Sequence, residues 1–263
     1  MSRLSPSATL VSPKGDSKVM SSWLARRRRD PKIKLRLFCF PFAGGGASSF
    51  ASWTHLFPAE IEICAIQLPG RESRLNETPF AHLSLLVEKL SAVIAPYLDA
   101  PFAFYGHSMG ALIGFELARR LRRESEPRPI HLFVTCHRAP HLPAPHPPIH
   151  QLPDLALVAE LMRRYDTAEI LLQNAELREM LLPALRADLR ACETYWYSPE
   201  DPLDCPISAF GGAQDQMVSR RELAAWRAQT RSRFTLRMLA GGHFFTQTTQ
   251  QLIARLLYQE LET

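Results

Sequence analysis

The chain has 263 residues, of which 46% are hydrophobic, which is enough to bury a full core as one large domain or as one domain with an insertion. Its formal net charge of +5 comes from the first 34 residues, where nine Lys and Arg stand against two Asp, and the remainder is slightly acidic. The charge therefore does not predict a polybasic face of the kind that binds nucleic acid or an acidic membrane surface.

The five cysteines do not form the pattern of a disulfide framework. They are an odd number without close pairs, and three lie in apolar, strand-like runs, so we expect buried, reduced thiols and a soluble cytoplasmic protein. CxxC and HExxH motifs are absent, so we expect neither a metal nor a cofactor of the protein's own. The basic stretch near the N-terminus lacks the apolar run of about 7–15 residues that a signal peptide needs, and no run approaches the roughly 18 apolar residues of a membrane span.

The N-terminal 31 residues are rich in Ser, Pro and Arg and show no periodicity. We therefore expect residues 1–31 to be a disordered extension ahead of a folded domain over 32–263. The first strand is predicted at 33–40, where Pro41 ends a continuous apolar run. The small residues of 42–49 follow, and we interpret them as an oxyanion loop, whose N–H groups can approach a reacting carbonyl; a flexible connector is the alternative.

The middle of the chain alternates strands and helices. A second buried strand is predicted at 61–68, and Thr78-Pro79 predicts the start of a helix that ends near Leu98, with Thr78 as its N-cap. A strand then precedes the turn at 106–110, a helix follows to 123, and another strand is predicted at 130–136. Strands that are apolar throughout and separated by helices indicate a parallel sheet covered on both faces.

The turn Gly106-His107-Ser108-Met109-Gly110 lies between a predicted strand and a predicted helix. A G-x-S-x-G in that setting is typical of a nucleophile elbow, which holds a serine hydroxyl above the end of a sheet. We expect a Cβ at Gly106 or Gly110 to strike the strand or helix packed across the turn. The motif predicts an α/β-hydrolase fold with a mostly parallel central sheet; a Gly-Ser turn without chemistry is the alternative.

The alternation breaks after the strand at 130–136. Residues 137–153 contain six prolines and four histidines, which fit a loop better than a metal site, and 155–197 is helical in pattern. We expect this insertion, over about 138–198, to form a helical lid at the carboxyl end of the sheet, with a pair of ordinary packing helices as the alternative. A strand at 206–212, a helix at 219–229, a strand at 234–239 and a helix at 246–261 complete the prediction.

Two residues at strand ends complete a catalytic triad with Ser108. Asp215 follows the strand at 206–212, and His243 follows the last strand, in the order Ser, Asp, His that this fold uses. A serine needs such a base, itself oriented by an acid, to attack a carbonyl. Asp201 and Asp204 compete for the acid role but precede their strand, and His107 competes for the base but should point into the packing.

The triad predicts two-step acyl transfer through an acyl-enzyme. His243 would take the proton of Ser108, Asp215 would stabilise the imidazolium, and the backbone N–H groups of Ala43 and Met109 would hold the oxyanion. The triad does not distinguish esters, amides and thioesters.

Five sequence motifs indicate which class of acyl substrate the enzyme would use. Phe40 to Gly46 (FPFAGGG), Leu68 to Arg71 (LPGR), the elbow, Leu182 to Asp188 (LPALRAD) and Gly241 to Phe245 (GGHFF) together resemble the type II thioesterases of polyketide and nonribosomal peptide synthesis. The resemblance covers about 35–261, and the animal fatty-acid-synthase thioesterase is similar. It implies that the triad falls on Ser108, Asp215 and His243, and that the insertion is the lid.

The resemblance further implies an editing enzyme for antibiotic and related pathways. Its substrates would be acyl or aminoacyl groups on the phosphopantetheine arm of acyl or peptidyl carrier proteins, and we expect a monomer that binds neither nucleic acid nor membrane. A small-molecule carboxylesterase on the same fold and a non-catalytic accessory protein that binds carriers are the alternatives. Five arginines are candidates for carrier docking or for a solvated helix end, namely Arg119, Arg120, Arg122, Arg123 and Arg128.

Overall fold

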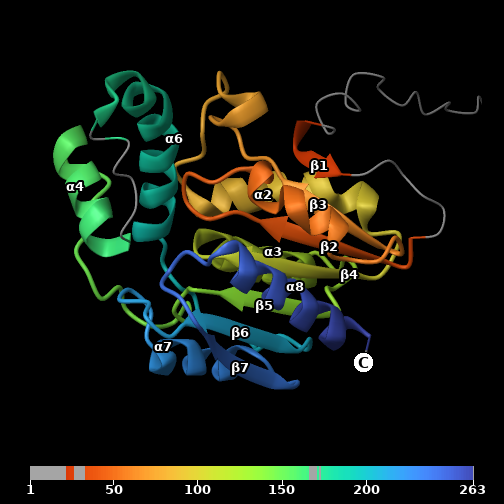
Figure 1. Ribbon diagram of the computed structural model, residues 1–263. Coiled ribbons are helices and arrows are strands. Elements are labelled where there is room, and N and C mark those ends of the chain that lie inside the picture. The colour runs from red at the N-terminus through yellow and green to blue at the C-terminus, as the bar shows by residue number, and fades with distance from the viewer. Residues whose placement is uncertain (1–21, 27–32, 166–170, 172, 263) are drawn as a thin grey trace, which may run out of the picture.

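The computed structural model describes residues 22–26, 33–165, 171 and 173–262, and Figure 1 shows one central sheet with helices on both faces. The sheet has seven strands in the order β1-β3-β2-β4-β5-β6-β7, antiparallel only between β1 and β3. Their bounds are Leu24–Arg26 (β1), Leu35–Phe40 (β2), Ile61–Ile66 (β3), Phe102–His107 (β4), His131–Thr135 (β5), Ile207–Gly212 (β6) and Phe234–Leu239 (β7). The predicted α/β-hydrolase fold with a mostly parallel sheet is confirmed.

Strands β2 to β6 are mostly apolar because both of their faces are buried. Successive residues of a strand point to opposite faces, so Leu37 of β2 enters one core while Phe38 enters the other. The core on the Phe38 side is covered by α2 (Leu83–Ile94), α3 (Met109–Arg123) and the pair α7 (Arg220–Ala224) and η4 (Ala225–Gln229). The core on the Leu37 side is covered by the 3-10 helix η1 (Ala47–His55) and by α8 (Gln247–Leu261).

The long helices α4 (Asp154–Tyr165) and α6 (Ala175–Glu193) lie between β5 and β6 in the chain and stand beside the sheet in Figure 1. We call them the lid helices. They share a small apolar core of their own, in which Leu157 and Val158 of α4 are fully buried. Of the helices among the described residues, none is long and apolar enough to cross a bilayer.

The prediction that residues 1–31 form a disordered extension is wrong for residues 22–26. Leu24–Arg26 forms β1 and pairs with β3, and Trp23 is only 2% exposed, with the guanidinium of Arg74 3.9 Å from its ring centre. The Gln67 N–H also donates to the Trp23 carbonyl at 2.9 Å. Residues 1–21 and 27–32 of the expected extension lie outside the described residues.

The helix that Thr78-Pro79 predicts, α2, begins later in the chain than this signal indicates. Its N-cap is His82, which makes no side-chain capping bond, and α2 starts at Leu83. The preceding segment leaves the helical path because Phe80 packs against Trp23, with ring centres 6.0 Å apart. At the other end α2 stops at Ile94 and a 3-10 turn, Ala95–Tyr97, follows, because Pro96 has no N–H to continue the helix.

Candidate active site

Ser108 occupies the sharp turn between β4 and α3. Its φ of 52° lies in the left-handed region, which is strained for a residue with a side chain. A Cβ on Gly106 would lie 2.1 Å from the Gly110 carbonyl oxygen, and one on Gly110 would lie 2.1 Å from the Phe40 carbonyl oxygen. The predicted steric need for both glycines is therefore confirmed, and the turn holds the serine at the N-terminus of α3.

The three side chains of the predicted triad lie together. The Ser108 hydroxyl is 3.0 Å from Nε2 of His243, and Nδ1 of His243 is 2.9 Å from Oδ2 of Asp215. The other carboxylate oxygen of Asp215 accepts from the N–H of Met217 at 2.8 Å and of Val218 at 3.3 Å. These bonds fix the carboxylate, so the imidazole donates through Nδ1 and presents Nε2 as an acceptor to the serine.

The surroundings keep Asp215 ionised. Burial raises the pKa of this carboxyl, but the hydrogen bonds from His243, Met217 and Val218 outweigh burial, so its pKa lies below the ordinary value. Cys136 lies beside the pair, and its ligand atom is within 4.8 Å of those of Asp215 and His243. Burial and the nearby Asp215 charge raise the pKa of the Cys136 thiol. Because Asp215 and His243 already bond each other and the thiol stays protonated, these groups form a hydrogen-bonded cluster with little capacity to ligate a metal.

The two predicted oxyanion donors come from β2 and α3. Ala43 follows β2 and lines the same pocket as Ser108 and His243, and Met109 is the first residue of α3. Neither backbone N–H donates in the hydrogen bonds found among the described residues. The first N–H groups of a helix have no intrahelical acceptor, which leaves Met109 available to an anion.

Side chains from distant segments hold the loop that carries Ala43. Asp188 of α6 accepts from the Gly44 N–H at 2.7 Å and forms a bidentate ion pair with Arg71. Arg71 also donates to the Gly45 carbonyl at 3.3 Å, and Gln67 accepts from the Ala47 N–H at 3.0 Å. The sequence analysis noted Arg71 and Asp188 only as parts of motifs, because their pairing across 117 positions has no local signal.

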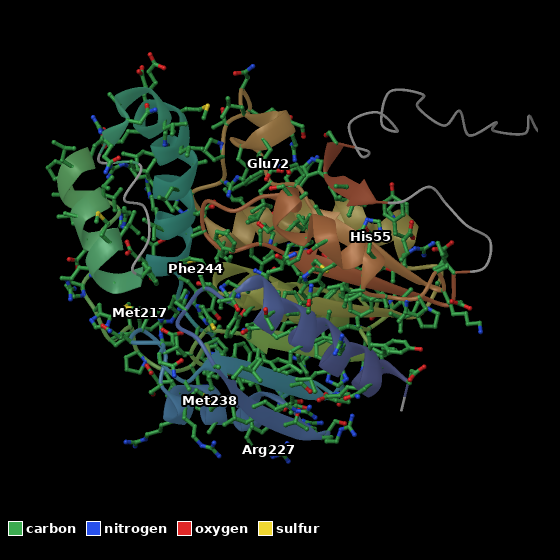
Figure 2. All side chains as sticks on the ribbon, viewed as in Figure 1. His55, Glu72, Met217, Arg227, Met238 and Phe244 are labelled. Atoms are coloured by element: carbon green, nitrogen blue, oxygen red, sulfur yellow. The ribbon has the colours of Figure 1, made fainter. Side chains whose placement is uncertain are left out.

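The lid helices and the Pro-rich loop form the wall of the pocket above Ser108. Tyr165 of α4 lies over the His243 imidazole, with ring centres 4.8 Å apart, and Leu189, Cys192 and Glu193 of α6 line the same pocket. Figure 2 shows Met217 and Phe244 on this side of the sheet, towards the lid helices. Tyr165 was not identified from the sequence, where an aromatic residue at the end of an amphipathic helix looks like packing.

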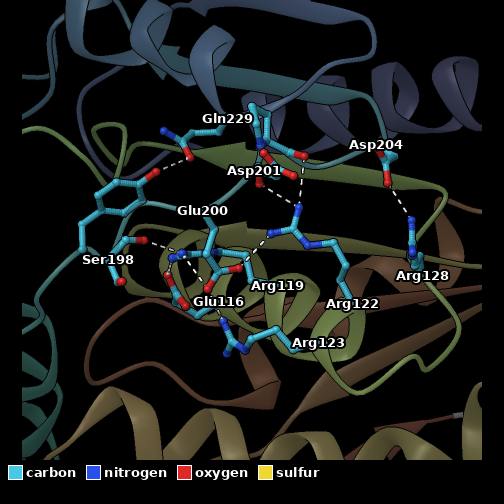
Figure 3. A network of polar contacts seen from close by, with 12 residues as sticks. Glu116, Arg119, Arg122, Arg123, Arg128, Ser198, Glu200, Asp201, Asp204 and Gln229 are labelled. Atoms are coloured by element: carbon cyan, nitrogen blue, oxygen red, sulfur yellow. Dashed lines mark hydrogen bonds and ion pairs between the residues drawn. The ribbon is translucent and has the colours of Figure 1, made fainter.

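The competing acids and bases lie elsewhere or serve packing. Asp201 pairs with Arg231 at 2.9 Å, and Asp204 pairs with Arg128 at 2.6 Å; all four side chains are exposed. Figure 3 shows the Asp204–Arg128 pair. His107 is buried beneath Phe244, with stacked rings 5.7 Å apart. Burial and the charge of His243 lower the pKa of His107 to about 3.

The histidines of the Pro-rich loop are separated by their individual partners. His141 bonds Gln229 at 2.8 Å, and His150 bonds Glu193 at 2.7 Å. His137 bonds a neighbouring carbonyl through Nδ1. These contacts favour the predicted loop over a shared metal site.

Comparison with known proteins gives consistent matches over most of the chain. The family model described as Thioesterase domain matches residues 35–259. The gramicidin S biosynthesis protein GrsT of Aneurinibacillus migulanus is 46% identical over 242 residues, covering 92% of this chain and 94% of that protein.

Solved structures agree. The type II thioesterase BorB from the borrelidin biosynthetic cluster superposes with a TM-score of 0.81 at 35% identity, covering 92% and 97% of the two chains. The RedJ thioesterase from the prodiginine pathway of Streptomyces coelicolor gives 0.79 at 40% identity, covering 88% and 92%.

Proposed function

The chain belongs to the thioesterase family, and we propose that it is a free-standing editing enzyme of polyketide or nonribosomal peptide synthesis. It hydrolyses acyl or aminoacyl thioesters from the phosphopantetheine arm of carrier proteins. The observation that carries the proposal is the 3.0 Å contact between the Ser108 hydroxyl and His243, at the floor of a pocket walled by the lid helices. GrsT is named for gramicidin S biosynthesis and BorB as a type II thioesterase of the borrelidin biosynthetic cluster, which supports the substrate class.

Catalysis begins with attack of Ser108 Oγ on the thioester carbonyl carbon. His243 Nε2 takes the serine proton, and Asp215 stabilises the imidazolium through Nδ1–H. The tetrahedral oxyanion accepts from the N–H groups of Ala43 and Met109, which are aimed at charge that develops only in the transition state. The C–S bond then breaks, and His243 returns the proton to the departing thiolate.

Water completes the cycle by the same steps. Water attacks the acyl carbon on Ser108 while His243 accepts the proton of the water. The free acid is then released, and His243 returns the proton to regenerate the serine hydroxyl. The chemistry needs no group beyond these side chains, the two backbone N–H donors and the substrate's own arm. The five cysteines are free thiols, which supports a reducing cytoplasmic location, and we expect the protein to act as a monomer.

The test compares three substrates that carry one acyl group: a carrier thioester, acyl-CoA and a p-nitrophenyl ester. Ser108→Ala should abolish turnover of all three and labelling by a fluorophosphonate, with Tm unchanged. Ser73→Ala, on the exposed surface, is the matched control and should keep full activity. A strong preference of the native enzyme for the simple ester would assign a carboxylesterase, and an unlabelled Ser108 would assign a non-catalytic carrier-binding protein.

A further inference from the structure

Two neighbouring hollows follow the face of α6 that is turned away from the catalytic pocket. One, of about 350 Å³, lies between α6 and the helices α2 and α3, and the other, of about 510 Å³, lies between α6, Ala81 and the Pro-rich loop. Thr194 lines both, so they form one groove, which we call the outer groove. Leu189, Cys192 and Glu193 on the opposite side of α6 line the catalytic pocket.

Trp196 at one end of the outer groove is 88% exposed, which is exceptional for the largest apolar side chain. Its two neighbours hold it there. The Tyr195 hydroxyl donates to Glu116 at 2.7 Å, and the Tyr197 hydroxyl donates to Gln229 at 3.2 Å. These bonds anchor the chain on both sides of Trp196 while its indole stays exposed to solvent, and tryptophan is enriched among the residues at the centres of protein interfaces.

Arginines dominate the lining of the outer groove. Four arginines line it with one carboxylate, Glu116, and three of the four are ion-paired, with Glu124, Glu200 and Asp154. These arginines are Arg120, Arg123, Arg186 and Arg190. The guanidinium of Arg190 is exposed and has no hydrogen-bond or ion-pair partner within the part of the chain that the structure describes.

The arginines that the sequence analysis names as candidates for docking are largely neutralised by ion pairs. Figure 3 shows Arg119, Arg122 and Arg123 gathered around Glu200, and Arg128 bonded to Asp204. They stabilise the link from α6 to β6 and leave little free charge. The accessible cation is therefore on α6 itself.

We propose that the outer groove is the docking surface of the acidic carrier domain, with Trp196 as its apolar anchor and Arg190 as its charge anchor. The proposal rests on the proposed function. Carrier proteins are generally acidic, which suits the exposed, unpaired guanidinium of Arg190 in this arginine-lined groove, whereas a second copy of this chain would bring arginines against arginines. The outer groove and the catalytic pocket lie on opposite sides of α6, about one helix diameter or 10 Å apart, so a carrier seated here would hold its flexible arm close to the pocket.

One contact connects the outer groove to the catalytic pocket. His150 lines the groove, Glu193 lines the pocket, and the two side chains bond at 2.7 Å. Glu193 also accepts from the N–H groups of Ile149 and His150 at 3.0 Å, which ties the Pro-rich loop to α6. The wall between partner and active site is therefore thin at this point.

Steady-state kinetics with a carrier thioester and with the N-acetylcysteamine thioester of the same acyl group test the proposal. Trp196→Ala and Arg190→Glu should each raise KM for the carrier substrate at least tenfold, with kcat/KM for the small thioester within twofold of native. Leu155→Ala and Arg221→Glu are the controls, since both residues are exposed on other helices, and should leave both substrates unaffected.

Fluorescence gives a direct reading of binding. Trp23, Trp53 and Trp226 are at most 2% exposed, so acrylamide quenching reports mainly on Trp196. A tryptophan-free apo-carrier should protect the native protein from quenching, and should give no such protection in Trp196→Phe.

Three results would overturn the proposal. They are native carrier kinetics in both groove variants, equal losses on both substrates, and a dimer of the native protein that Trp196→Ala converts to monomer. A native enzyme that does not favour the carrier over the small thioester would instead refute the proposed function, before any variant is made.

Discussion

Replacement of Asp188 by Asn should lower both the stability of the fold and kcat, the latter because the proposed oxyanion donor is displaced. Asp188 is the acceptor for the Gly44 N–H at 2.7 Å, one residue beyond the proposed donor Ala43, and it is the counter-charge of Arg71. Both charged side chains are about 3% exposed. Burial raises the pKa of the Asp188 carboxyl, and the Arg71 guanidinium and the Gly44 N–H act against that rise.

The expected loss of folding free energy follows from the interactions that Arg71 loses. Removal of one partner of a buried ion pair costs about 3–5 kcal/mol, because the other charge stays buried without compensation. Arg71 keeps its bonds to the Pro69 carbonyl at 3.2 and 3.1 Å, so we expect the lower end, about 3 kcal/mol. Loss of a complete oxyanion donor costs about 10²–10³ in kcat, and a displaced donor loses part of that, so kcat should fall about 10–100-fold with little change in KM.

Urea titration and kinetics on a small thioester measure the two effects. The decisive control is the double variant Arg71→Met with Asp188→Leu, which replaces the ion pair by apolar side chains and should recover most of the stability. It lacks the acceptor for Gly44, so its kcat should stay low although its fold is stable. Native kcat in a stably folded double variant would refute the claim that Asp188 positions the oxyanion loop.

Three further perturbations test the packing around the site. Gly110→Ala should prevent stable folding because its Cβ would lie 2.1 Å from a carbonyl oxygen of β2, whereas Gly114→Ala, one turn along α3, meets ordinary contacts and should raise Tm slightly in a thermal melt. Trp23→Ala should lower the free energy of unfolding by about 3–5 kcal/mol in urea; an unchanged midpoint would place β1 outside the cooperative unit. Burial lowers the pKa of His107 to about 3 and of His131 to about 4, so below pH 6.5 the unfolded chain binds protons that the folded chain does not. Stability should therefore fall as the pH drops from 6.5 towards 4, by up to about 1.4 kcal/mol per pH unit for each histidine, and a flat profile in urea titrations would contradict this.

Strands β2 to β6 were predictable because burial on both faces leaves mostly apolar runs. The half-buried edge strand at 234–239 was also predicted with its observed bounds. The edge strand β1 was not, since three residues beside a run of arginines carry no such signal. It forms because Trp23 finds a pocket against Arg74 and Phe80, which are about 50 residues away in the chain. The same contact overrode the Thr-Pro helix signal, so one tertiary interaction accounts for both errors.

The meeting of Ser108, Asp215 and His243 followed from topology alone. Parallel strands end at one edge of a sheet, so residues just beyond β4, β6 and β7 converge whatever separates them in sequence. The roles of Tyr165 and Asp188 could not be predicted from the sequence. The insertion does not pair with the sheet, so no local pattern shows which face of a lid helix contacts the site.

The five sequence motifs that carry the family resemblance contact one another in the folded protein, which explains why they occur together. The first motif contacts the elbow, since a Cβ on Gly110 would strike Phe40, and it contacts the last motif through the rings of Phe42 and Phe244, 4.9 Å apart. It also bonds the second and fourth motifs, through Arg71 and Asp188. The loop that carries Ala43 is thus held by all four other motifs. A change in one of them moves the same donor, so we expect double variants across motifs to be strongly non-additive in kcat, whereas independent effects that simply multiply would show that the motifs act separately.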